Sequence, residues 1–434
     1  MRAPRILNLA VVAAAAIAVI HCSADGADGK NGADGVGTPG AAGPSGAMGA
    51  LGPQGAPAAG VDGGLPTGCL SPCHGFSGIV EQWKTSTHYA TYITNLGDDE
   101  AASWTTPGSP CGNCHANDAV ERRMASEVGT TGGTVTNLLN GELGYKNAGG
   151  LLAEATYTGS AKVAQVGCTT CHSVDPTTDP HRTGLAYTPG SFPLRAKTGA
   201  DDDVFIEKSA VVGTISGTAV GKLGPANACV MCHRSRKDVT NYITASNKIT
   251  SPNWGPHEGP QTDVYSGQGG YQFTGQTYGQ STHQQKLTCV DCHMPDVAAN
   301  GGAPNHSFYP QLSACLSCHA GATSFDIDGG QGYVKAALKE LEGALDDQGL
   351  LTRATAAPYP PLGTARGDGN FDLDKTNPTG TPTLTADQAG ALYNFIIVAR
   401  GGALGVHNPK YAKQLVYDSI VAIKGTTPVS IVRP

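Results

Sequence analysis

The chain has 434 residues and a formal net charge of −7 with both signs interspersed, which excludes a dominant basic surface for nucleic acid. It contains 60 glycines but only 8 phenylalanines and 3 tryptophans. With so few bulky side chains, a large conventional core is difficult to build. Either part of the chain is irregular, or something other than side chains fills its interior.

Residues 1–24 are predicted to be an export signal. Arg2 and Arg5 precede an apolar stretch over 6–20 that is too short to span a membrane. Two interpretations of Cys22 remain open: acylation as the first residue of a lipoprotein, which would anchor the protein to a membrane, or cleavage as an ordinary signal. Both predict an exported protein, located in the periplasm or on the outer membrane and cell surface.

Residues 25–63 are predicted to form a stalk. Between Gly26 and Gly55, glycine recurs at every third position with one slip, which is the pattern of a collagen triple helix. The segment is short and poor in proline, so two alternatives stay open. It is either an extended flexible spacer or a triple helix that joins three copies of the chain.

Residues 64–330 are predicted to form a haem domain of short helices and long loops. Five C-x-x-C-H sequences, the attachment signal of haem c, occur within it. In each, two thiols bond to the porphyrin and the following histidine becomes the proximal iron ligand. The motifs are Cys111-Cys114-His115, Cys168-Cys171-His172, Cys229-Cys232-His233, Cys289-Cys292-His293 and Cys315-Cys318-His319.

A sixth candidate motif, Cys69-Leu-Ser-Pro-Cys73-His74, has one additional residue between its cysteines. It is either a small disulfide loop or a sixth haem site. The chain has 13 cysteines, of which twelve lie in the six motifs and the remaining one is Cys22. No pair is left for structural disulfides, which favours the haem interpretation.

The histidines outside the motifs are predicted to be the distal iron ligands. Apart from His21 in the signal, they number six, one for each proposed haem: His88, His181, His257, His283, His306 and His407. Among the methionines, only Met124 lies where it could compete. Histidine on both sides of each iron predicts haems of low reduction potential, because replacing one histidine by methionine raises the potential.

The C-terminal segment, 331–434, differs from the rest in showing helical periodicity. A first helix is predicted from an apolar face that ends near Gly349. The residues of this face are Val334, Leu338, Leu341 and Leu345.

Capping signals predict two further helices. Thr385 and Gln388 form a capping box before the second helix, and Asn408-Pro409 begins a third that ends at Gly425. We expect their apolar faces to pack on haems and on one another. The predicted fold is therefore mainly α with extensive loops, little or no β-sheet and a haem-packed core.

One acidic cluster resembles a calcium loop. Asp368, Asn370, Asp372 and Asp374 occupy alternate positions, but the glycine and final acidic residue of an EF-hand are missing. Calcium binding and a solvated acidic turn both remain open.

The segment from His283 to His319, "HQQKLTCVDCHMPDVAANGGAPNHSFYPQLSACLSCH", resembles the pentahaem cytochrome c nitrite reductases and their octahaem relatives. The sequence around His407 is similar to a C-terminal ligand segment of that family. The sequence ending at His88 is similar to a ligand segment of many multihaem cytochromes. Together these similarities span roughly 69–424 and imply a shared haem-packing scaffold.

The chain departs from that family at the active haem. The reductases carry a C-x-x-C-K motif with an open iron position, and no such motif occurs here. Where the family's active-site tyrosine and calcium ligands would follow, this chain has the basic run 234–237. The departure argues against nitrite reduction.

Three functions follow from these patterns. The first is a hexahaem c-type cytochrome that carries electrons in anaerobic or extracellular respiration, with other redox proteins or an external acceptor such as a metal oxide as partners. The alternative is a reductase of nitrite, hydroxylamine or a related small nitrogen or sulfur compound, which requires one unligated iron. His257, in a Gly/Pro-rich loop, is the distal candidate that would then not bind. The third is a structural role for the stalk.

Overall fold

The computed structural model describes residues 73–74, 78–94, 112–115, 144–146, 152–154, 166–177, 179–183, 192–196, 204–205, 219–221, 223–235, 239–249, 254–257, 260–298, 302–352, 372–373 and 383–434. The predicted signal, Cys22, the stalk, Cys69 and Cys111 lie outside these residues. So do Asp368, Asn370 and Asp374 of the acidic cluster, while only the backbone of Asp372 is described.

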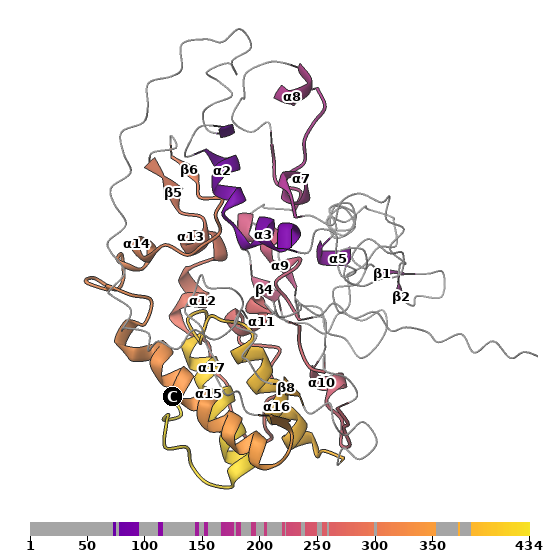
Figure 1. The fold of residues 1–434 in the computed structure, drawn as a ribbon, viewed down its shortest axis with the longest axis vertical. Helices are drawn as coiled ribbons and strands as arrows, with labels where there is room; N and C mark the ends of the chain where they lie inside the picture. Colours follow the sequence, from indigo (N-terminus) through magenta and orange to yellow (C-terminus); the bar gives the residue numbers. More distant parts are fainter. Residues whose placement is uncertain are drawn as a thin grey trace, which may run out of the picture.

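The helices described before residue 330 are short, and most are single turns or little more (Figure 1). They are α2 (Ile79–Lys84), α3 (Thr87–Thr94), α5 (Gly112–His115), α7 (Cys168–Cys171), α8 (Pro180–Thr183), α9 (Asn227–Val230), α10 (Val239–Tyr242), α11 (Gln261–Tyr265), α12 (Thr282–Lys286), α13 (Cys289–His293) and α14 (Leu312–Cys315).

The strands in the described part of the chain are two or three residues long. They pair as four separate antiparallel two-stranded ladders. The pairs are β1 (Gly144–Lys146) with β2 (Leu152–Glu154), β3 (Val204–Phe205) with β4 (Ala219–Gly221), β5 (Asp296–Val297) with β6 (Ala303–Pro304), and β7 (Leu351–Thr352) with β8 (Asp372–Leu373).

The three predicted C-terminal helices are confirmed as α15 (Gly330–Asp347), α16 (Ala386–Ala399) and α17 (Pro409–Lys424). The Thr385 hydroxyl accepts a hydrogen bond from the Gln388 amide, and the Asn408 side chain accepts one from the Tyr411 amide. Gly425 ends α17 in the left-handed conformation. The caps therefore form as the sequence indicates, because they depend only on neighbouring residues.

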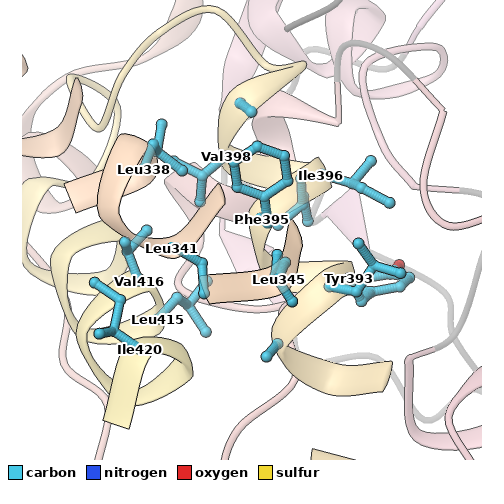
Figure 2. Packing of buried hydrophobic residues seen from close by; sticks show 14 of the residues in the cluster. Leu338, Leu341, Leu345, Tyr393, Phe395, Ile396, Val398, Leu415, Val416 and Ile420 are labelled. Atoms are coloured by element: carbon cyan, nitrogen blue, oxygen red, sulfur yellow. The ribbon is translucent and has the colours of Figure 1, made fainter. Parts of the chain in front are cut away.

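These three helices pack against one another around a conventional core (Figure 2). Leu338 and Leu341 of α15, Phe395 of α16 and Leu415 of α17 are each 0% exposed. The expected packing of the three apolar faces on one another is therefore confirmed, while their packing on haems stays a prediction. Periodicity did not show that α16 would be buried almost all round.

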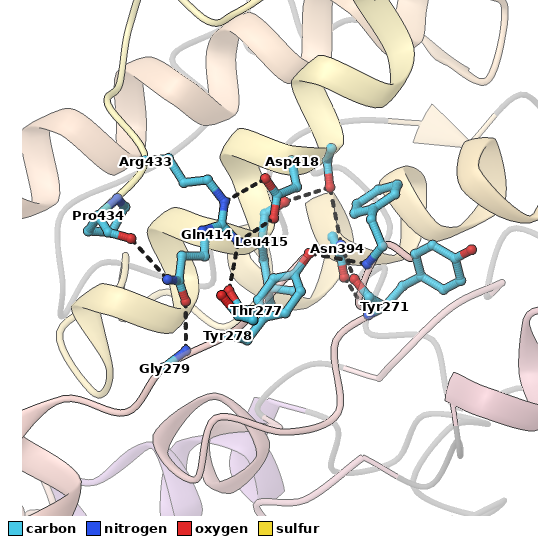
Figure 3. Close-up of polar contacts among 12 residues, drawn as sticks. Tyr271, Thr277, Tyr278, Gly279, Asn394, Gln414, Leu415, Asp418, Arg433 and Pro434 are labelled. Carbon is cyan, nitrogen blue, oxygen red and sulfur yellow. Dashed lines mark hydrogen bonds and ion pairs between the residues drawn. The ribbon is translucent and has the colours of Figure 1, made fainter. Parts of the chain in front are cut away.

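Polar contacts tie this core to the preceding domain and to the chain end (Figure 3). The Asn394 amide on α16 bonds both the backbone amide and the carbonyl of Tyr271. Arg433 donates two hydrogen bonds to Asp418 of α17, at 2.8 and 2.9 Å. The C-terminal helices are thereby held against residues that precede the motifs of α13 and α14.

Within the described residues, no helix has the length and apolar character needed to cross a lipid bilayer.

Candidate haem-ligand site

The cysteine motifs lie on single helical turns. Backbone bonds from His172 to Cys168, from His233 to Cys229 and from His319 to Cys315 measure 2.8–3.0 Å and each span four residues. Residues three and four apart share one face of a helical turn. The two thiols and the histidine of a motif are therefore presented on the same side, as one flat macrocycle requires.

Each motif histidine faces one histidine from elsewhere in the chain. The ring centroids of the six pairs are 5.9–6.3 Å apart, and each of the twelve predicted ligands belongs to one pair. The pairs are His74 with His181 (5.9 Å), His115 with His257 (6.3 Å), His172 with His306 (6.3 Å), His233 with His88 (6.0 Å), His293 with His407 (6.1 Å) and His319 with His283 (6.2 Å).

This spacing fits one metal ion between two imidazoles. Zinc–histidine bonds are about 2.0–2.1 Å, so a metal held by a nitrogen on each side places the ring centroids roughly 6.3 Å apart. Aromatic rings in direct contact have centroids anywhere between about 4.5 and 7 Å apart, so the narrow spread of the six separations is the informative feature. The six separations cluster at the metal-bridging distance, and two nitrogens would leave four coordination positions for a porphyrin.

Each distal histidine comes from a different element. His88 lies on α3, His181 on α8 and His283 on α12. His257 lies in the loop before α11, His306 in the loop after β6, and His407 just before α17. Five of the six pairs therefore depend on the fold to bring distant segments together, and His257, the weakest candidate from sequence, is paired like the others.

Many of these imidazoles are oriented through their Nδ1 atoms. Backbone carbonyls lie 2.6–2.8 Å from Nδ1 of four histidines, and side chains of Asp179 and Gln261 take this role for His181 and His407. The four carbonyl-bonded histidines are His172, His283, His293 and His306. A ligating histidine usually donates its second N–H in this way, which leaves Nε2 for the metal.

The protonation of the distal imidazoles also suits metal binding. Burial, followed by the nearby His233, His115 and His293, lowers the pKa of His88 to about 3. Burial, followed by His293, His233 and His283, does the same for His407. Both rings are therefore neutral at ordinary pH, the form in which histidine ligates a metal.

Burial makes several of the motif thiols less acidic than usual. It raises the pKa of Cys171 to about 11 and that of Cys292 to about 11. A hydrogen bond between Cys229 and Cys289, together with burial, raises the pKa of Cys229 well above its ordinary value, and the same hydrogen bond lowers the pKa of Cys289. Reactive cysteines have lowered pKa values, so burial does not activate Cys171, Cys229 or Cys292 as nucleophiles. The contact between Cys229 and Cys289 also brings two different motifs together.

The basic run after the His233 motif is not a simple surface patch. Arg234 and Ser235 are only 6% and 1% exposed, and the Ser235 amide donates to Asp263 at 2.8 Å. Arg236 and Lys237 lie outside the described residues. This part of the run is thus built into the interior next to the motif.

Two residues near the pairs had no sequence signal. Gln261 accepts from His407 Nδ1 at 2.6 Å, and its own amide donates to the Gly401 carbonyl. Phe308 has a ring centroid 4.7 Å from that of His88. A lone glutamine or phenylalanine is too common for sequence to single it out, since only the fold shows what it contacts.

Among the described residues, no three or more His, Cys, Asp or Glu side chains form a group that could hold a bare metal ion.

In the comparisons with known proteins, neither a protein-family model nor a curated protein matches the chain. Among solved structures, the outer cell wall cytochrome OcwA matches 80% of this chain at 19% sequence identity, with a TM-score of 0.41. This chain covers 50% of that cytochrome, about half its length. Similarity this distant does not establish a common fold.

Proposed function

We propose that the protein is a hexahaem c-type cytochrome whose irons are each held by two histidines and which carries electrons. The observation that supports it is the one-to-one match between six motif histidines and six others at metal-bridging distance. Chance proximity would not be expected to use every ligand once.

The chain's own residues have simple tasks in this proposal. The cysteines of each motif would hold a haem covalently, and the motif histidine and its partner would hold its iron. Bound haem would supply one-electron oxidation and reduction. With a histidine on each side of the iron, the site would offer no place for a substrate, so the protein would relay charge and not transform a reactant.

Several pairs lie close enough to form a continuous path. The pKa of His88 is lowered by the motif histidines of two other pairs, His115 and His293, and that of His407 by His233 and His283. The contact between Cys229 and Cys289 also joins the His233 and His293 motifs directly. The pairs of His115, His233, His293 and His319 are thus neighbours, which supports transfer from one haem to the next.

The exposed pair His74–His181 suits exchange with a partner. Both side chains are exposed, and Asp179 holds His181 at 3.0 Å. We propose this pair as one end of the path, with another redox protein or an external acceptor as partner. The predicted export signal and stalk would place the domain outside the cytoplasm, in anaerobic or extracellular respiration. Both the lipid anchor and the trimer remain proposals.

Reductive titration of the purified protein tests the proposal. Mass spectrometry should show six covalent haems per chain, and dithionite should deliver six electrons that oxidised acceptors can withdraw again. A matched variant, Cys73→Ser with His74→Ala, should lose one haem and one electron. Fewer than six haems, or turnover of nitrite or hydroxylamine by the purified protein, would contradict it.

A further inference from the structure

The loop between β6 and α14 contains an unusual backbone conformation. Phe308 has φ of +59°, in the left-handed region that residues other than glycine rarely adopt. A conformation of this kind persists only where surrounding contacts determine it, and it frequently marks a functional position. Phe308 is partly buried and lies two residues after the ligand candidate His306.

Phe308 contacts three different histidine pairs. Its ring centroid lies 4.7 Å from that of His88, edge to face, and 5.8 Å from that of His306. Its backbone carbonyl accepts a hydrogen bond from Nδ1 of His293 at 2.8 Å. The ring therefore contacts one histidine of the His88–His233 pair and one of the His172–His306 pair. The carbonyl contacts a third pair, His293–His407.

Hydrogen bonds on both sides hold this loop in place. The His306 amide donates to the Gln82 side chain on α2 at 2.8 Å, and the Ser307 amide donates to Asn305 at 2.8 Å. The Asn305 amide donates to the Pro295 carbonyl at 3.1 Å, and that of Gln311 to the Cys292 carbonyl at 3.0 Å. The left-handed residue is thus supported by contacts with α2 and with the segment that carries the His293 motif.

We propose that Phe308 is a positioning residue that sets the environment of three adjacent haems, through its ring for two of them and its carbonyl for the third. The inference rests on the proposed function, because it takes these imidazoles to be iron ligands. The ring shields two distal ligands from water, and the carbonyl fixes the orientation and raises the basicity of a proximal one. Solvent exposure and hydrogen bonding around a ligand are the means by which a protein tunes haem potential.

Phe308→Gly separates the two roles. Glycine adopts the left-handed conformation without strain, so the carbonyl contact to His293 should survive while the ring is lost. Water reaching the two ligands favours the oxidised, more highly charged iron. We expect two of the six components in a potentiometric titration to shift to lower potential. A tenfold change in the oxidised-to-reduced ratio of a haem corresponds to a shift in potential of about 59 mV. We expect this ratio to change about three- to tenfold for each of the two haems.

Two controls make the result specific. Phe308→Tyr keeps a ring and should restore the wild-type titration. Phe273→Ala removes a ring from the helical core, where Phe273 is 8% exposed and contacts Tyr271, and should leave all six components in place. If Phe308→Gly does not accumulate with six haems, Phe308→Asn is titrated in its place with the same expectation, because asparagine also tolerates the left-handed conformation and lacks the ring.

The outcomes separate the inference from the proposed function. Unchanged potentials in Phe308→Gly, or equal shifts of all six components, would overturn the role of Phe308 while leaving six low-spin haems in place. A wild-type protein with fewer than six haems, or with a high-spin haem, would overturn the proposed function first.

Discussion

Removal of His407 should open one haem, and only one. The ring of His407 lies 6.1 Å from that of His293 and its Nδ1 is bonded to Gln261. Under the proposed function, His407→Ala removes one ligand of the His293 iron, while the other five pairs keep theirs because His407 belongs to none of them.

The size of the effect follows from the pairing. One of six haems, about one sixth of the iron, should become high-spin and bind carbon monoxide once reduced, giving one carbon monoxide per chain. The unpaired Gln261 oxygen should reduce the free energy of unfolding by about 1 kcal/mol, too little to unfold the domain.

Carbon monoxide difference spectra of the reduced protein, titrated to saturation, measure this stoichiometry. Lys410→Ala changes an exposed residue of α17 that lies three positions after His407; this matched control should bind none. The reasoning fails if His407→Ala binds no carbon monoxide, or if the wild-type protein already binds one.

Three further predictions concern other parts of the structure. Gln261→Glu should lower the potential of the His293–His407 haem, because a carboxylate accepts more strongly from His407 Nδ1 than the amide does; a titration identical to wild type would argue against this contact. Leu341→Ala, at a site that is 0% exposed, should lower the free energy of unfolding by about 2–5 kcal/mol in denaturant titrations, and a loss well below this range would show that the three-helix core is not packed as described. The ring planes of His74–His181 and His283–His319 are 83° and 89° apart, against 31° in His172–His306, so paramagnetic resonance should show two haems with the large g value of perpendicular ligands, a signal absent if those planes are parallel.

Local sequence signals predicted local structure well. The capping box at Thr385 and the Asn408-Pro409 start of α17 could be predicted because each involves residues three positions apart. The twelve candidate ligand histidines could be selected by counting, since the chain has six motif histidines and six others apart from His21. Their proposed role as iron ligands stays a prediction.

Long-range arrangement could not be predicted. Nothing local connects His88 with His233, because they are far apart in the sequence and only the tertiary fold brings them together. The burial of α16 on nearly all sides was missed for the same reason, and so was Phe308, since neither composition nor periodicity encodes a left-handed phenylalanine. These features depend on tertiary contacts, which override local preference.

Spin quantitation of the fully oxidised protein by paramagnetic resonance tests the central claim most directly. Imidazole on both sides of every iron predicts six low-spin ferric haems per chain and no high-spin signal near neutral pH. A high-spin signal that integrates to one or more haems per chain would contradict it, because such an iron lacks its second histidine.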